Sequence, residues 1–126
     1  MAVAVTNTTL TALNASKTKV ADACTSTVTN GAEVITITPT KGCAKMLIEL
    51  AQASTLTFTY SIAAATTYSG AKAITGTVGV APGSVIQVDT CRVLSTTGTV
   101  VITLTPSTGV ALVAGHTAKV SVFELL

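Results

Sequence analysis

The sequence predicts an all-β protein, an antiparallel β-sandwich of jelly-roll type with an extended N-terminal arm. Stretches of alternating apolar and polar residues, the period-2 pattern of half-buried strands, recur along the 126 residues. Glycine and proline turn signals separate them about every 8 to 15 residues, which is the spacing of sandwiches and barrels. No helical pattern of convincing length interrupts the series.

Residues 1–30 are predicted to form the arm, or an edge strand, and residues 31–126 the sandwich domain. The first segment is rich in Thr, Asn and Ala and has no sustained period. It offers too little apolar surface to offset its own ordering entropy, so we expect it to order only against something else. Asn30-Gly31 closes the segment with a turn signal.

Two nearly identical stretches anchor the prediction of the domain. VITITPTKG begins at Val34 and VITLTPSTG begins at Val101. Each alternates hydroxylated and apolar residues, and each ends in a proline, which has no N–H for a strand ladder. Each copy is therefore predicted to be a strand that ends in a turn. A looser echo links 76–89 with 109–122, which is consistent with the reuse of strand-turn units in the two Greek keys of a jelly roll.

The remaining strands follow from the same alternation. We expect Val34–Thr38 and Cys43–Leu50 to form a hairpin, and Thr55–Tyr60 to point Leu56, Phe58 and Tyr60 inward. Ser84–Val93 is expected to be one strand with a bulge near Thr90 that swaps its faces. Further strands are predicted at Ala73–Val80, Val100–Thr105, Gly109–Ala114 and around Ala118, Val120 and Val122.

Composition excludes several classes of function. The net charge is +2, and the seven basic residues form no cluster with aromatic residues between them, so nucleic-acid binding is not expected. No apolar run approaches the roughly 18 residues that cross a bilayer, and the N-terminus has no secretory signal pattern. Aromatic residues are 3% of the chain and Trp is absent, so the core must be built from Val, Ile, Leu and Ala.

Candidate chemical groups are few. Cys24, Cys43 and Cys91 are expected to be buried, reduced thiols, with one disulfide plus a free thiol as the alternative. His116 is the only histidine, and a Cys91–His116 nucleophilic pair lacks any flanking signature. The three cysteines with His116 have the ligand types for zinc, but not the spacing of known zinc motifs.

The five carboxylates form no calcium-loop pattern, and the glycines form no phosphate-binding motif. We therefore predict no catalytic, cofactor-binding or metal-binding residues, no cofactor and no enzymatic activity.

The low charge points to a covered surface. Charged residues are 10% of the chain, against roughly 25% in ordinary globular proteins, and about one residue in five is threonine. The stretches Val34–Thr38, Thr55–Tyr60 and Val100–Thr105 contain no charge, so an exposed sheet edge among them would pair with another chain. We expect copies of the chain or a larger scaffold to cover much of the outer surface.

The chain combines Thr/Ala/Val/Gly-rich strands, a polar N-terminal segment, and a C-terminus that ends in the strand VSVFELL. In composition and strand style, the whole chain therefore resembles the small structural proteins of tailed bacteriophage virions, most of all the capsid decoration, or cement, proteins. The resemblance implies a sandwich or jelly roll, often trimeric, on the outside of the head. It would bind the major capsid protein and clamp neighbouring subunits.

On this hypothesis the chain is made in the host cytoplasm and acts without a membrane, in the virion, with residues 1–30 as the segment that contacts the shell. Two other hypotheses stay open. One is a different virion part, such as tail tube, neck or fibre. The other is a secreted β-sandwich binding module, for which Phe58, Tyr60, Tyr68 and Phe123 are the aromatic residues available.

Overall fold

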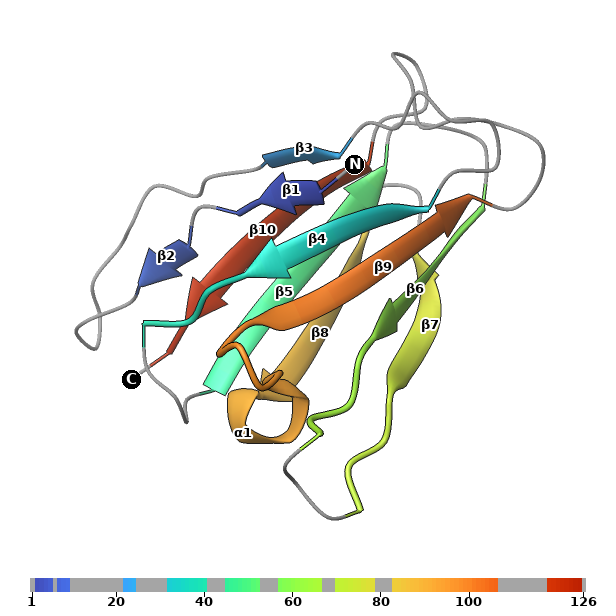
Figure 1. Ribbon diagram of the computed structural model, residues 1–126. Coiled ribbons are helices and arrows are strands. Elements are labelled where there is room, and N and C mark those ends of the chain that lie inside the picture. The colour runs from blue at the N-terminus through green and yellow to red at the C-terminus, as the bar shows by residue number, and fades with distance from the viewer. Residues whose placement is uncertain are drawn as a thin grey trace.

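The structure is a computed structural model, which describes residues 2–5, 7–9, 22–24, 32–40, 45–52, 57–66, 70–78, 83–106 and 118–125. These residues form two β-sheets with a single helical turn at one end (Figure 1). The strands are β1 Ala2–Ala4, β2 Asn7–Thr9, β3 Asp22–Cys24, β4 Glu33–Ile37, β5 Lys45–Gln52, β6 Phe58–Ile62, β7 Ile74–Val78, β8 Ser84–Asp89, β9 Val100–Pro106 and β10 Ala118–Glu124, and the turn is α1 Thr90–Val93.

The two sheets have a defined strand order. Sheet A runs β1-β4-β9-β6-β7, and sheet B runs β2-β10-β5-β8 with β3 also paired to β10. Four antiparallel pairs are nested along the chain: β3 with β10, β4 with β9, β5 with β8, and β6 with β7. Each successive pair lies in the other sheet, so the chain is a long double-stranded ribbon folded back and forth between two layers.

The expected hairpin between Val34–Thr38 and Cys43–Leu50 is wrong. The strands β4 and β5 lie in opposite sheets, and each pairs with other strands. Both present a continuous apolar face, Ile35 and Ile37 on β4 and Met46, Ile48 and Leu50 on β5. Crossing between the sheets brings these two faces together, whereas a hairpin would place them side by side on one surface.

The expectation of antiparallel pairing holds for strands β3 to β10. The strands β1 and β2 differ, since β1 pairs with β4 in parallel and β2 pairs with β10 in parallel. They are separated by two residues and belong to different sheets, so this short segment runs along the side of the molecule from sheet A to sheet B (Figure 1).

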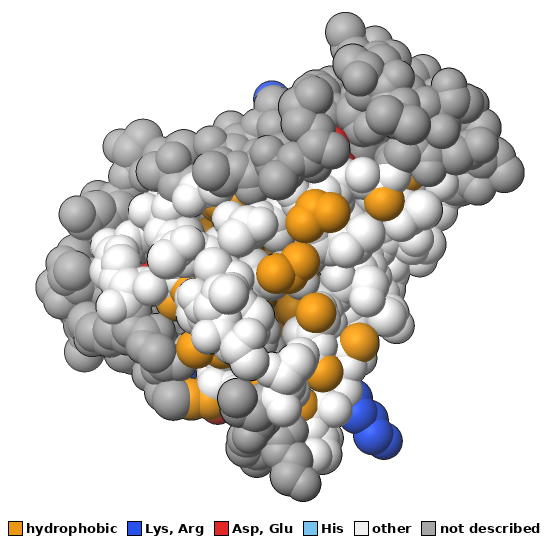
Figure 2. Space-filling view, viewed as in Figure 1, with side chains coloured by type: hydrophobic (Ala, Val, Ile, Leu, Met, Phe, Trp, Pro, Cys, Tyr) orange, Lys and Arg blue, Asp and Glu red, His pale blue; other side chains and the backbone are white. Residues whose placement is uncertain are grey.

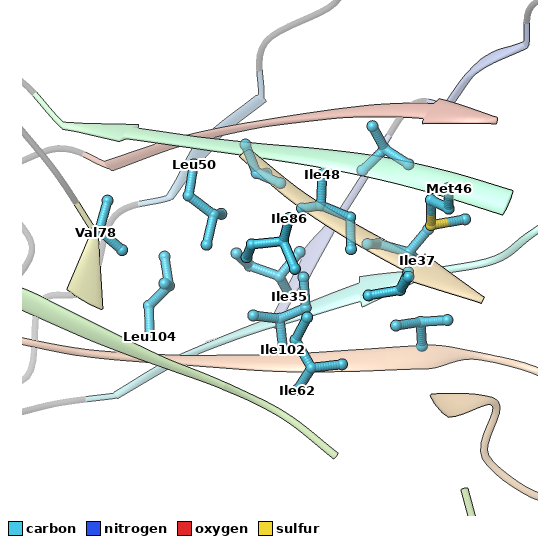
Figure 3. Packing of buried hydrophobic residues seen from close by; sticks show 14 of the residues in the cluster. Ile35, Ile37, Met46, Ile48, Leu50, Ile62, Val78, Ile86, Ile102 and Leu104 are labelled. Carbon is cyan, nitrogen blue, oxygen red and sulfur yellow. The ribbon is translucent and has the colours of Figure 1, made fainter. Parts of the chain in front are cut away.

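The core lies between the two sheets and is almost entirely aliphatic. Side chains of β4, β9 and β6 interleave with those of β5 and β8 (Figure 3). Phe58 is the one aromatic side chain that is fully buried among the described residues, as the 3% aromatic content requires. Buried apolar residues are Ile35, Ile37, Met46, Ile48, Leu50, Phe58, Ile62, Val78, Ile86, Val88, Val93, Val100, Ile102, Leu104, Ala118, Val120 and Val122.

The two copies of the nine-residue repeat form β4 and β9, and they are direct antiparallel neighbours. Their register centres on Ile35 opposite Ile102, which is the second residue of each copy. The hydroxylated residues of both strands therefore point outward together, and the isoleucines point into the core together. The predicted alternation of both strands is confirmed. The strand β4 ends before Pro39, and Pro106 is the last residue of β9.

The predicted strand Ser84–Val93 ends four residues early. Instead of a bulge, the structure has a helical turn at Thr90–Val93, for which Asp89 is the N-cap: its carboxylate accepts a hydrogen bond from the Cys91 N–H at 3.1 Å. A helical turn brings residues three apart to one side, and both Thr90 and Val93 are buried. A hydrogen bond joins this turn to the connection between β6 and β7 of sheet A: the Ala65 N–H donates to the Arg92 C=O at 2.9 Å.

The prediction for Thr55–Tyr60 is partly confirmed. Phe58 is fully buried, Tyr60 is only half-buried, and Leu56 lies outside the described residues. Tyr60 sits opposite Gly76 on β7, and a Cβ at Gly76 would lie 2.6 Å from the tyrosine Oη. The ring therefore covers the glycine and occupies space that any other residue at position 76 would fill.

Candidate interaction surface

The outer side of sheet A is a surface of hydroxyl groups without charge, which we call the threonine face. It consists of the outward residues of β4, β9, β6 and β7, alternate with the buried ones. Figure 2 views this face, with polar and apolar side chains over its centre and a basic side chain at its lower margin. Its members are Val34, Thr36, Thr59, Ser61, Thr75, Thr77, Val101, Thr103 and Thr105.

The pairing register arranges these side chains in rows across the strands. One row runs Val34, Thr103, Ser61, Thr75 and crosses four strands, and a second runs Thr105, Thr59, Thr77. Neighbours within a row are about 4.8 Å apart, the spacing between paired strands. The named members of this face are all Thr, Ser or Val, so together they present methyl and hydroxyl groups and include no long side chain.

The outer side of sheet B is different. Its outward residues include Lys45 and Glu49 on β5, Asp89 on β8 and Lys119 on β10. Lys45 lies directly opposite Asp89, so charges of opposite sign are neighbours on this face. Charges are costly to strip of water and are depleted in the centres of protein interfaces. Of the two outer faces, the threonine face is therefore the one suited to contact with another protein.

The uncharged strands do not lie at a sheet edge. The stretches predicted as a pairing hazard form β4, β6 and β9, and all three are interior strands of sheet A. Because β1 and β7 flank them, none of the three is an exposed edge, and the pairing expected of such an edge does not arise from them. The strand β7 is itself free of charge, and its last two carbonyl groups are covered by sheet B: Ser84 Oγ donates to Thr77 C=O at 3.1 Å and Gln52 Nε2 to Val78 C=O at 3.0 Å.

A buried carboxylate holds the start of the chain to its end. Glu124 on β10 is only 2% exposed and accepts hydrogen bonds from Asn7 Nδ2 and Thr40 N–H, both at 2.8 Å, and from Thr40 Oγ1. Asn7 Nδ2 also donates to the Thr38 carbonyl group at 2.7 Å. This cluster, which we call the Glu124 cluster, joins β2 and the segment after β4 to β10, and no motif in the sequence predicted it.

A second carboxylate, that of Glu33, is also buried. Glu33 is the first residue of β4 and points inward with Ile35, and its carboxylate oxygens have no hydrogen-bond partner among the described residues. Desolvation raises the pKa of Glu33 above its ordinary value, and the positive charge of the amino terminus opposes part of that effect. The alternation of β4 already placed residue 33 on the inner side, which was the available signal for this burial.

Replacing Glu33 with Gln is expected to stabilise the protein at neutral pH. The folded-state pKa is raised, so the folded state binds more protons than the unfolded state, and stability falls as pH rises from about 4.5 through the folded-state value. E33Q should therefore melt at a higher temperature than the wild type at pH 7 and at a similar temperature near pH 4. Thermal unfolding across this range measures the difference; E33Q curves parallel to those of the wild type would contradict a buried, ionising carboxylate.

The predicted chemical residues are only partly within the described residues. Cys91 is disulfide-bonded, so the expectation of three reduced thiols is wrong, and its sulfur is neither a free nucleophile nor a free metal ligand. The Cys24 backbone lies in β3, while Cys43 and His116 lie outside the described residues, as does the predicted strand Gly109–Ala114. Within the described part of the chain, no three His, Cys, Asp or Glu residues form a group that could hold a metal ion.

Neither a family model, nor a curated protein, nor a solved structure matches the chain. Among the described residues, the structure has no helix with the length and apolarity needed to span a bilayer.

Proposed function

We propose that this chain is a structural protein of a tailed-phage virion that binds the major capsid protein and stabilises the head as a decoration protein, without catalysis. The observation that carries the proposal is the unequal distribution of charge. The threonine face has no ionised side chain, whereas the opposite face carries Lys45, Glu49, Asp89 and Lys119. A protein seated on a shell would turn the first face to its neighbours and the second to solvent.

The strand pairing supports a jelly roll as the finer description of the fold. Nested antiparallel pairs that alternate between two sheets are what a jelly roll requires, and the pairs β3–β10, β4–β9, β5–β8 and β6–β7 have this order. In the proposal, residues 31–126 supply most of the sandwich that sits on the outside of the head. Residues 1–30 are the segment that reaches the shell, and their described strands β1, β2 and β3 complete the sandwich by pairing along its sheet edges.

The partners in this proposal are the major capsid protein and further copies of the chain, with a trimer as the favoured oligomer. Face-to-face or side-by-side contact through the threonine face needs no charge pairing. Its hydroxyl groups can donate and accept hydrogen bonds without the desolvation cost of a carboxylate or an ammonium group.

A second candidate, a secreted binding module, is favoured by the Cys91 disulfide, because disulfides persist mainly in oxidising surroundings. Its aromatic residues support it less. Phe58 is fully buried, Tyr60 is half-buried over Gly76, and Phe123 is half-buried on the outer side of sheet B. Micromolar binding on a glycan array, with no binding to phage heads, would favour this candidate over the decoration protein.

A matched pair of lysine substitutions tests the role of the threonine face. Thr59 and Gln87 are both exposed, outward residues within strands, Thr59 on the threonine face and Gln87 on the outer side of sheet B. With heads of the virus that encodes the chain, T59K should weaken co-sedimentation roughly 30-fold or more, since burying an unpaired charge costs about 2 kcal/mol or more. Q87K should bind as the wild type does.

The same heads provide the functional readout. Saturating wild-type protein is expected to raise the temperature at which the heads disrupt, and T59K is expected to raise it only at much higher concentration. Heads whose stability is unchanged by saturating wild-type protein would overturn the proposed function. Equal binding by T59K and Q87K would overturn the assignment of the face.

A further inference from the structure

Cys91 forms a disulfide, and the register of the strands identifies its partner. The chain has three cysteines, so the partner within the chain is Cys24 or Cys43. A disulfide requires Cα atoms within about 7 Å of each other. The position of Cys91 relative to the strand ladder therefore decides between the two.

Cys24 is at the wrong end of sheet B. It pairs with Ala118, which in turn lies opposite Gln52 at the last position of β5. Cys91 follows Asp89, which lies opposite Lys45 at the first position of β5. The two ends of this eight-residue strand are about 23 Å apart at the usual rise per residue, and three strand spacings separate β3 from β8. Cys24 cannot reach Cys91 within this fold.

Cys43 has the matching position. It precedes Lys45 by two residues, and Cys91 follows Asp89 by two residues, while Lys45 and Asp89 are direct antiparallel partners. Two residues of chain span at most about 7 Å, so Cys43 and Cys91 each lie within that reach of the Lys45–Asp89 pair, close enough for the Cα separation that a disulfide requires. We infer that Cys91 is cross-linked to Cys43 and that Cys24 is the remaining thiol.

The inferred bond has a defined structural effect. It closes a loop that contains β5, β6, β7 and β8, which are the two inner pairs of the nested ribbon. On the Cys91 side the bond lies in α1, which directly follows β8 at the end of this inner unit. Its formation removes two protons and two electrons from the thiols, which dioxygen or an exchanging disulfide accepts. A chain made in a reducing cytoplasm would therefore gain this cross-link after exposure to oxidising surroundings.

Tryptic mapping without reduction tests the pairing, because Lys and Arg residues separate all three cysteines. Cleavage places Cys24 in peptide 20–41, Cys43 in peptide 42–45 and Cys91 in peptide 73–92. After free thiols of the unfolded, oxidised protein are alkylated, we expect peptide 42–45 linked to peptide 73–92 and alkylated Cys24. A link between peptides 20–41 and 73–92, or alkylation of Cys91, would overturn the inference.

Single serine variants give an independent measurement. Removal of a native disulfide that closes a loop of this length is expected to lower the melting temperature by about 8–15 °C. C43S and C91S should each show this fall in melting temperature, and the double variant C43S/C91S should fall no further. In C24S, the melting temperatures of the oxidised and the reduced protein should differ as much as they do in the wild type. A loss in C24S with none in C43S would identify the other pair.

Discussion

Substitution of Phe58 by Ala is expected to remove about 3–5 kcal/mol from the free energy of unfolding. Phe58 is fully buried on the inner side of β6, with Val78 of β7 and Pro106 of β9 as its cross-strand neighbours. Every other buried residue of the described core has a smaller side chain than Phe58, so truncation at this position leaves a cavity that these neighbours fill only in part. For a chain of 126 residues this corresponds to a fall of about 10–20 °C in melting temperature.

The other phenylalanine of the chain is the matched control. Phe123 is half-buried on the outer side of β10 opposite Leu47, so F123A should cost about 1 kcal/mol or less. Urea unfolding, with the slope of the transition checked for a change in exposed surface, measures both variants. Equal losses of unfolding free energy in F58A and F123A would contradict the placement of Phe58 on the inner side of sheet A and of Phe123 on the outer side of sheet B.

Substitution of Glu124 by Ala is expected to cost about 3 kcal/mol. The buried carboxylate is the acceptor for Asn7 Nδ2, Thr40 N–H and Thr40 Oγ1, and its removal takes a charged acceptor from all three part-buried hydrogen bonds at once. Because the Glu124 cluster joins β2 and the segment after β4 to β10, the loss should also be local. Hydrogen exchange at the Thr40 amide should become much faster in E124A than the loss of global stability explains.

Two further variants sharpen this measurement. E124Q keeps one carbonyl oxygen as an acceptor, so it should fall between the wild type and E124A. E49A removes a carboxylate from the outer side of β5 and should cost no more than about 1 kcal/mol, as is usual for half-exposed charges. If E124A were as stable as E49A, with unchanged exchange at Thr40, the Glu124 cluster would have no role in holding the strands together.

The alternation of side chains predicted much of the local structure correctly. The inward positions of β4, β5, β9 and β10 were assigned from period 2 alone, because successive side chains of any strand point to opposite sides of its sheet. The same pattern failed at Thr90–Val93, where one capping carboxylate on Asp89 was enough to favour a helical turn over a bulge. Residues 33 and 124 continue the inward series of β4 and β10, but the predicted strand began at Val34 and the predicted inner face ended at Val122, so the burial of these two glutamates was not predicted.

The pairing of the strands was much harder to predict from the sequence. Strands β4 and β5 are separated by a short connection that fits either a hairpin or a crossing between sheets, and the choice depends on which apolar faces meet. The Glu124 cluster depends on donors that are 84 and 117 residues away along the chain, so no local motif could predict it.

Composition and the period-2 pattern establish that this protein is built from strands, which side chains of most strands enter the core, and that the core is largely aliphatic. These properties depend on neighbours two positions apart and on composition. The pairing of strands in three dimensions places the two repeat strands side by side inside one sheet, puts Lys45, Glu49, Asp89 and Lys119 on the outer side of the other, and brings Cys91 near the start of β5. Those outcomes depend on which strands pair, and pairing is fixed by the joint burial of faces from distant parts of the chain.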